Sequence, residues 1–248
     1  MVINKNGRGI MFLLLLMAIL AVFAFSYFDI NGNSFHENER EYPLLKEEGK
    51  EEIVKLPEPR HDGDVSLEKA VAERRSVRSY REEPLTLEQV SQLLWSAQGI
   101  TEENRGLRTV PSAGALYPLT VYAVAGEVTD LEVGFYEYLP HQNELRRLSL
   151  GDLRKDLYEA ALNQSAVRDA PLVMVISANY QKTTGNYGDR GIRYVHMEAG
   201  HAGQNVYLQG VSLGIKGVVI GAFEDEQVRE VLNLSPEEDP LYLIPLGK

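Results

Sequence analysis

Three arginines lie within five residues, at Arg74, Arg75 and Arg78, in a chain whose formal charge at pH 7 is −11. Guanidinium groups bind phosphate oxygens through paired hydrogen bonds, and Ser76 adds a hydroxyl donor between them in sequence. The spacing therefore indicates a site for one small anion such as a phosphate. A purely structural role is the alternative, because cations near the C-terminus of a helix are stabilising by about 0.3–1 kcal/mol without any ligand.

Two further segments carry small residues where main-chain groups can approach a bound molecule closely. Residues 111–118 are bounded by prolines and contain a Ser-Ala-Gly-Ala run, and residues 217–223 contain two glycines. Small side chains permit such an approach. We therefore expect these two segments to converge with residues 74–78, called the arginine cluster below.

The composition narrows the kinds of chemistry. The chain has 25 Lys and Arg against 36 Asp and Glu, which argues against nucleic acid as a partner because no broad basic surface is available to meet phosphates. It contains no cysteine, which excludes disulfides, thiolate metal sites and a cysteine nucleophile. With 44% hydrophobic and 25% charged residues it has the composition of a globular protein.

Three familiar motifs fail on spacing or context. His196 and His201 are five residues apart, about 140° around a helix, so they cannot share a zinc ion as histidines four residues apart do. We expect no metal site and give both histidines packing or interface roles. Gly210, Gly214 and Gly217 follow a helical pattern instead of a strand, so they are not a dinucleotide fingerprint. No Gly-x-Ser-x-Gly elbow is present, which leaves hydrolase chemistry without a nucleophile.

The elements that must position these residues follow from hydrophobic periodicity. The sequence predicts helices at 66–74, 86–99, 152–162, 191–213 and 225–232. It predicts strands at 119–125, 134–138, 145–148, 172–178, 215–220 and 241–245. The continuous apolar run at 172–178 indicates a central strand buried on both faces. Strands and helices do not alternate regularly, which favours an α+β domain with a mixed or antiparallel central sheet flanked by helices.

The N-terminal region has a different character. Lys5 and Arg8 precede residues 10–28, which carry no charge and are long enough to span a membrane. We expect an uncleaved transmembrane anchor at 1–30, with a removed signal peptide as the alternative, and a catalytic domain on the extracytoplasmic side. Residues 31–62 are polar and predict a linker. The globular domain is then expected at 63–248.

The three candidate segments, taken in order, resemble the nitroreductase superfamily of FMN enzymes. Residues 75–80 (Arg-Ser-Val-Arg-Ser-Tyr), 111–118 (Pro-Ser-Ala-Gly-Ala-Leu-Tyr-Pro) and 241–248 carry the resemblance, together with Glu198-Ala199-Gly200-His201 and Gln204-Asn205. Residues 111–118 are specifically similar to the SagB-type (thiazole/oxazole-forming) dehydrogenase branch. Over about 66–248, the resemblance implies a nitroreductase-like fold and a homodimer that holds FMN between its subunits.

The resemblance also implies roles for individual residues. It places Arg74, Arg75 and Ser76 at the FMN phosphate and ribityl chain. Lys248 is a further candidate partner of the phosphate. Arg78 falls where the family places a cation near flavin N1 and O2, where it stabilises the negative charge that reduction creates.

The flavin ring is expected to meet main-chain groups from two segments. The resemblance places Ser112, Ala113, Gly114 and Ala115 against the isoalloxazine. It brings Ile220, Gly221 and Ala222 to N5. As catalytic residues it implies Arg78 and Tyr187.

One departure from the family affects the chemistry. Dehydrogenases of this branch use a Lys-Tyr pair, which aligns with Asn186-Tyr187. An asparagine takes up no proton at neutral pH, which argues against azole formation on a peptide.

The function expected from these features is FMN-dependent hydride transfer between a reduced donor such as NAD(P)H and a small-molecule or peptide substrate. The alternative is a membrane-tethered module that binds flavin without catalysis, or binds no cofactor and serves interaction alone.

Overall fold

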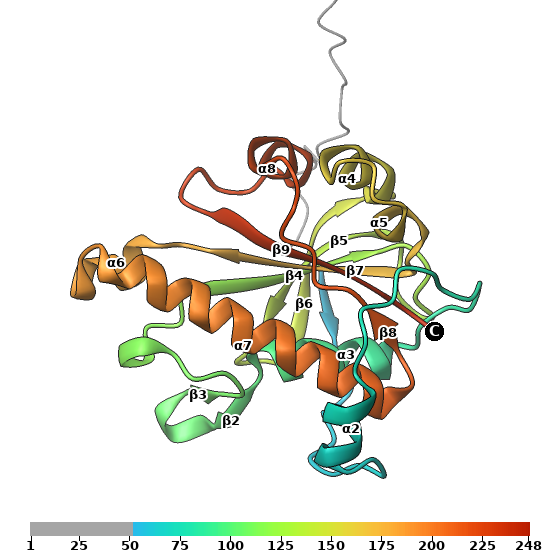
Figure 1. The fold of residues 1–248 in the computed structure, drawn as a ribbon, viewed down its shortest axis with the longest axis horizontal. Coiled ribbons are helices and arrows are strands. Elements are labelled where there is room, and N and C mark those ends of the chain that lie inside the picture. Colours follow the sequence, from blue (N-terminus) through green and yellow to red (C-terminus); the bar gives the residue numbers. More distant parts are fainter. Residues whose placement is uncertain (1–51) are drawn as a thin grey trace, which may run out of the picture. The chain divides into compact units, whose positions relative to one another are not determined.

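Seven strands form one sheet in the order β1-β6-β5-β4-β7-β9-β8, and every ladder between them is antiparallel (Figure 1). The computed structural model describes residues 52–248. The strands of this sheet are β1 (Ile53–Lys55), β4 (Leu119–Ala125), β5 (Gly134–Leu139), β6 (Glu144–Leu150), β7 (Leu172–Ala178), β8 (Lys216–Gly217) and β9 (Asp239–Gly247). A separate small ladder pairs β2 (Ile100–Glu102) with β3 (Leu107–Arg108).

Strand β7 lies between β4 and β9 and is buried along its whole length. Its apolar side chains point alternately to the two faces of the sheet, and each face is covered by a hydrophobic cluster. The expected central strand is therefore confirmed, as is the α+β fold with an antiparallel sheet. The expected hairpin of β5 and β6 is also confirmed.

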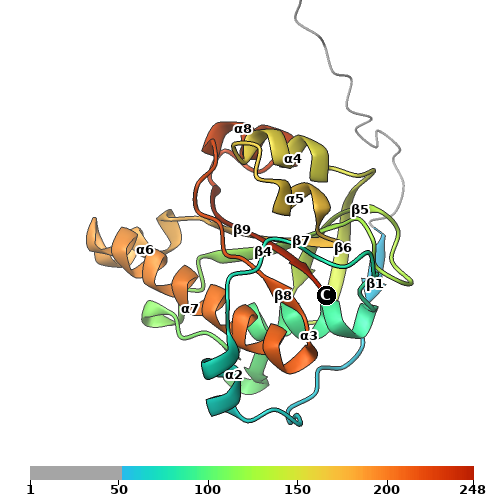
Figure 2. The same ribbon diagram turned by 45° about the vertical axis from the view of Figure 1, so that its right-hand side comes forward.

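Helices cover both faces of the sheet (Figures 1 and 2). Helices α3 and α7 pack on one face, and α4, α5 and α8 pack on the other. The helices are α2 (Leu67–Glu73), α3 (Leu87–Gln98), α4 (Arg154–Ala160), α5 (Ser165–Asp169), α6 (Gln181–Tyr187), α7 (Arg190–Leu213) and α8 (Asp225–Leu232), with 3-10 turns η1 (Glu103–Arg105) and η2 (Ala113–Ala115).

Local signals set the helix ends. The side chain of Thr86 accepts a hydrogen bond from Gln89 N, and the Gln89 side chain accepts one from Thr86 N, so α3 begins with a capping box. Helix α7 ends at Gly214, whose φ of 68° is a left-handed conformation that glycine adopts readily. Ser66 caps α2, which ends at Arg74. The arginine cluster thus begins where this first helix stops.

The expected strand at 215–220 is shorter than predicted. Regular pairing with β9 covers only Lys216–Gly217, and a single bridge joins Ile220 to Leu243. Pro245 accepts a hydrogen bond from Val218 N through its carbonyl but has no N–H to return one, so the ladder is interrupted there.

The domain begins before residue 63, so the predicted end of the linker at 62 is wrong. Strand β1 pairs with β6 in register, and Leu56, which follows it, is only 5% exposed. Ile53 and Val54 are β-branched residues that fit a sheet edge, although the surrounding sequence is polar.

The predicted membrane anchor, at residues 1–30, lies outside the described part of the chain. Between residues 52 and 248, no helix combines the length and apolar character needed to cross a membrane.

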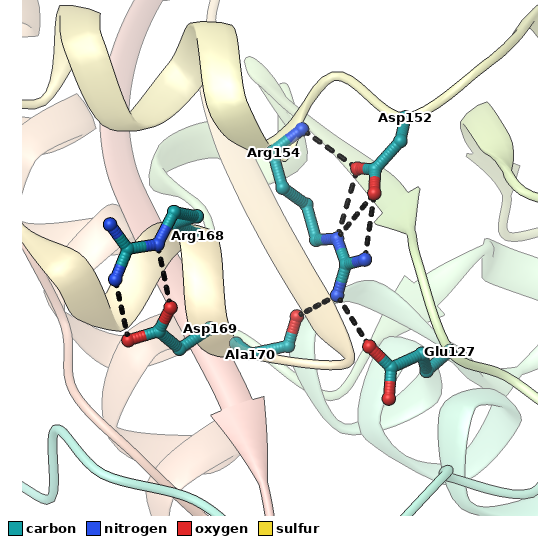
Figure 3. A network of polar contacts seen from close by, with 6 residues as sticks. All are labelled: Glu127, Asp152, Arg154, Arg168, Asp169 and Ala170. Carbon is teal, nitrogen blue, oxygen red and sulfur yellow. Dashed lines mark hydrogen bonds and ion pairs between the residues drawn. The ribbon is translucent and has the colours of Figure 1, made fainter. Parts of the chain in front are cut away.

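A polar network ties α4 and α5 to the end of β4 (Figure 3). The Arg154 guanidinium binds both carboxylate oxygens of Asp152 and donates to the Ala170 carbonyl at 2.9 Å and to Glu127 Oε1 at 3.2 Å. Its side chain is only 12% exposed. One side chain therefore joins three segments on the side of the sheet opposite α7.

Candidate functional site

The arginine cluster is held beside the chain segment that follows α7. Val77 N donates to the Gly217 carbonyl at 2.8 Å, and the Ser76 hydroxyl lies 2.9 Å from the hydroxyl of Tyr207 on α7. The Tyr207 hydroxyl also accepts a hydrogen bond of 2.8 Å from Val219 N. Tyr207 therefore connects the arginine cluster with residues 217–222, two of the three segments expected to converge.

The three arginines differ in what they contact. The Arg74 guanidinium lies over the Tyr207 ring, 5.0 Å from its centroid. Arg75 turns back and donates to the Ala72 and Arg74 carbonyls at the end of α2, so it fills the structural role that the sequence left open. Arg78 is exposed, and its charge opposes the rise in the pKa of Tyr80 that burial causes.

None of the three cluster arginines forms an ion pair within residues 52–248, so their charge is free to meet an anionic ligand. Lys248, the further candidate phosphate partner, lies near the same edge, because its carbonyl accepts from Arg81 N at 2.8 Å. Its ammonium group is paired with Glu83 Oε2 at 3.7 Å.

Residues 220–222, which follow the short strand β8, change from buried to exposed along the chain. Ile220 is 4% exposed, whereas Gly221 and Ala222 are exposed. The Ala222 carbonyl accepts from Gln164 Nε2 at 2.8 Å, which fixes this backbone in place. The segment presents main-chain groups without a covering side chain, as a close approach to a planar ligand requires.

A cavity of about 510 Å³ opens beside Gly221. Its walls come from the start of α6, the N-terminal half of α7, residues 221–225 and the start of β9. The lining residues are Tyr180, His196, Ala199, Gly221, Phe223, Asp225, Asp239, Pro240, Leu241 and Tyr242. Gly221 is the predicted site residue among these lining residues, so we take this cavity as the candidate substrate space.

The loop 111–118 has an unusual backbone. Gly114, Ala115 and Tyr117 have φ values of 64°, 53° and 45°, and two of these residues are not glycine. Positive φ is unfavourable for residues with a Cβ, and such strained conformations concentrate at functional sites. The Ser112 hydroxyl accepts from Tyr117 N at 2.9 Å and closes the loop on itself.

The loop packs on α6 and α7. A Cβ at Gly114 would lie 2.9 Å from the Tyr187 hydroxyl, so any larger residue there would make that tyrosine shift. Arg108, just before the loop, lies over the Tyr117 ring at 4.5 Å and donates to Gln98 Oε1. The predicted catalytic Tyr187 therefore contacts the loop and stands 40% exposed.

A buried carboxyl group lies beneath this loop and was not among the predicted site residues. Glu198 is 3% exposed, and its Oε1 atom has no hydrogen-bond partner within residues 52–248. Burial raises the pKa of Glu198 to about 7, although a hydrogen bond with Ser112 and the charge of Arg108 both oppose the rise. The burial of Glu198 could have been predicted from the sequence, because Val195 and Ala202 lie about one turn before and after it on the same face of the helix.

The loop 111–118 and the arginine cluster contact α7 at different points. The loop 111–118 is attached to α7 near Glu198, whereas the arginine cluster is attached at Tyr207. These attachment points are nine residues apart, about 13 Å along the helix axis. Sequence order alone does not show this separation.

A second cavity lies away from these segments. A cavity of about 530 Å³ between residues 60–67, α3 and the C-terminal half of α7 contains none of the predicted site residues. Across the described range 52–248, no group of three or more His, Asp and Glu side chains is arranged to hold a metal ion.

Comparison with known proteins decides the family. A sequence model described as the nitroreductase family matches residues 71–248. This chain belongs to the nitroreductase family. A protein of Methanocaldococcus jannaschii described as a nitroreductase is 47% identical over 185 residues, which cover 75% of this chain and 92% of that protein.

Two further proteins are similar to this chain. The crystal structure of a nitroreductase from Ralstonia eutropha has a TM-score of 0.70 and 30% identity, over 81% of this chain and 91% of that one. The microcin B17-processing protein McbC of Escherichia coli is 26% identical, over 60% of this chain and 57% of McbC. The likeness to McbC agrees with the SagB-type branch. Because it belongs to the nitroreductase family, this chain is an oxidoreductase of the nitroreductase type.

Proposed function

We propose that this nitroreductase-family enzyme binds FMN and uses it to move a hydride between a reduced donor such as NAD(P)H and a small-molecule or peptide substrate. The observation that carries the proposal is the arginine cluster, whose arginines form no ion pair within residues 52–248 and which lies beside Gly217, at the start of the segment that ends in the exposed Gly221 and Ala222. Bound FMN would supply reversible two-electron chemistry at its N5 atom.

The residues present fit this cofactor. Arg74 and Ser76 offer a guanidinium and a hydroxyl for the phosphate, and Arg78 offers a second uncommitted cation for the electron-rich edge of the ring. Arg75 and Lys248 already have partners in the chain, so we assign them supporting electrostatic roles.

The separation of the two binding segments along α7 supports a homodimer. In a two-fold arrangement, the loop 111–118 of one subunit can meet the arginine cluster of the other. Leu67 and Val71 on α2 are 66% and 56% exposed, and Met197 on α7 is 54% exposed. Helix α2 packs beside α7, so these apolar side chains lie on neighbouring elements that a partner subunit would cover (Figure 2).

The relatives point to two classes of substrate. McbC is described as a microcin-processing protein, which favours a peptide, whereas the nitroreductase names of the other relatives favour a small molecule. Asn186, at the position of the family lysine, favours a reaction other than azole formation.

We also propose that residues 10–28 anchor the enzyme in a membrane, with the catalytic domain outside the cytoplasm. Their charge-free length and the preceding Lys5 and Arg8 support this orientation. Digestion of intact cells, intact spheroplasts and lysed spheroplasts by an external protease tests it. The domain should be cleaved once the outer barrier is open and the inner membrane is intact, whereas full protection there would contradict it.

Purification of the full chain tests the redox proposal. The expected preparation is yellow, and its flavin absorbance bleaches on addition of NADH or NADPH and returns in air. A colourless protein that does not bind added FMN would contradict the proposal and support the alternative, a cofactor-free interaction module.

A further inference from the structure

We propose that Tyr180 and His196 form a proton-exchange pair for the substrate in the cavity beside Gly221, with Tyr180 contacting the substrate and His196 behind it. This inference rests on the proposed flavin chemistry, which requires a proton to accompany each hydride. Both side chains line the cavity of about 510 Å³ that also contains Gly221. They lie within the space to which the substrate was assigned.

The pair has a defined geometry. The Tyr180 hydroxyl and His196 Nε2 are 2.5 Å apart, and the two rings meet edge to face with centroids 5.5 Å apart. Tyr180 comes directly before α6, and its carbonyl accepts from Thr183 N and Thr184 N in the first turn of that helix. His196 is carried by the long helix α7. The two groups are therefore held by two helices instead of by a mobile loop.

The surroundings keep the phenol protonated. Burial, followed by the charges of Asp239 and Asp225, raises the pKa of Tyr180 to about 12. In the proposed pair this phenol donates to His196 Nε2, and the imidazole carries its own proton on Nδ1. Asp225 from α8 and Asp239 from β9 are the charged groups that line the cavity with the pair, and Arg193 lies one turn before His196 on α7.

The proton balance of the step follows from this arrangement. When a substrate is reduced, it receives a hydride on one atom and the Tyr180 hydroxyl proton on another, and the O–H bond of Tyr180 breaks. A proton from solvent then reaches the Tyr180 oxygen through His196, which takes it up, passes it on at Nε2 and returns to its neutral form. Oxidation of a substrate runs in reverse: the Tyr180 oxygen receives the substrate proton while its own proton passes to His196 Nε2 and from there to solvent. Two electrons and two protons are conserved in each direction.

Two electron acceptors separate proton exchange from flavin chemistry. Menadione takes up electrons and protons, whereas ferricyanide takes up electrons alone. In the full-length, FMN-loaded enzyme supplied with NADH or NADPH, Tyr180→Phe and His196→Gln are expected to lower menadione turnover by about 100-fold, within the range of general acid-base catalysis. Ferricyanide turnover is expected to stay at the wild-type rate. His141→Gln, an exposed histidine in the β5–β6 turn, is the matched control and should change neither rate.

The outcomes separate this inference from the proposed function. Absence of turnover with both acceptors in the wild type would overturn the flavin chemistry and this inference with it. Wild-type menadione turnover in Tyr180→Phe and His196→Gln would overturn this inference alone. Loss of menadione turnover only in Tyr187→Phe would likewise overturn it, by assigning proton exchange to the tyrosine at the loop.

A measurement without turnover tests the same pair. In the flavin-free protein, ¹⁵N NMR of the neutral His196 ring is expected to show an unprotonated Nε2 that shifts in Tyr180→Phe, while the His141 resonances stay unchanged. A neutral His196 ring protonated on Nε2 would overturn the inference.

Discussion

At Glu198 a carboxyl group lies in the packed contact between α7 and the loop 111–118, and one of its oxygens has no hydrogen-bond partner among residues 52–248. Its pKa is raised to about 7 by burial, against an ordinary value of 4.5. Below pH 4.5 the group is neutral in both the folded and the unfolded chain. As pH rises from 4.5 to 7, the unfolded chain releases the proton that the folded chain retains, so stability falls over this window and stays lower above it.

Glu198→Gln is therefore expected to remove this pH dependence. The uncharged amide keeps nearly the same shape, so the variant should be more stable than the wild type at pH 8 by about 1–3 kcal/mol, allowing for partial screening by solvent. Urea unfolding at pH 5 and pH 8 measures the difference, with the exposed Glu230→Gln as control. Equal pH slopes in the wild type and Glu198→Gln would show that the carboxyl is ionised without penalty.

The types of the candidate residues could be predicted from the sequence, but the directions of their side chains could not. The run of arginines predicted an anion site, yet Arg75 caps α2 and Lys248 pairs with Glu83. These contacts depend on where α2 stops and where β9 ends. Tyr180 and His196 are 16 residues apart in sequence, and only the turn between α6 and α7 brings them together.

At the scale of elements, strong periodic or continuous apolar patterns predicted the structure well. Strands β4 and β7 have their expected bounds, and α7 and α8 begin or end within a residue of theirs. Helices α5 and α6 and the β2–β3 ladder were missed because they are short and polar, so tertiary contacts decide their conformation. Helix α5, for example, has two buried side chains, Ala166 and Val167.

The network around Arg154 predicts how firmly α4 and α5 are fixed to the sheet. Arg154→Met keeps the hydrophobic stem but leaves the buried Ala170 carbonyl without its donor, so it should destabilise the fold by about 1–3 kcal/mol. Thermal or urea unfolding measures this change. Arg168→Met removes a pair with Asp169 in which both side chains are nearly half exposed, and should have no measurable effect (Figure 3). Equal effects of the two substitutions would contradict the structural role given to Arg154.

At the scale of the whole molecule, the loop 111–118 and the arginine cluster hold opposite ends of a stretch of α7, which is the reason for proposing a homodimer. Met197, next to Glu198 in sequence, lies on the exposed side of the helix. Met197→Glu is expected to convert the dimer to monomer, because a charge would be buried without a partner at the interface. Light scattering after size-exclusion chromatography measures the mass.

Val133→Glu is the matched control for this experiment. Val133 is 40% exposed in the turn before β5, so a charge there should leave the dimer intact. A wild-type chain that is monomeric at every concentration would refute the dimer. Dissociation by both substitutions alike would refute the assignment of the α7 surface.

In the proposed enzyme the arginine cluster binds the phosphate of FMN. Riboflavin lacks that phosphate, so comparing the binding of FMN and riboflavin tests this role most directly. Calorimetric titration of the flavin-free full chain should show FMN binding more tightly than riboflavin. Arg74→Ala should weaken FMN binding about 10–100-fold, as expected for a charge-assisted hydrogen bond, and leave riboflavin binding unchanged. Equal affinities for the two ligands in the wild type, or an equal loss of both in Arg74→Ala, would contradict the claim.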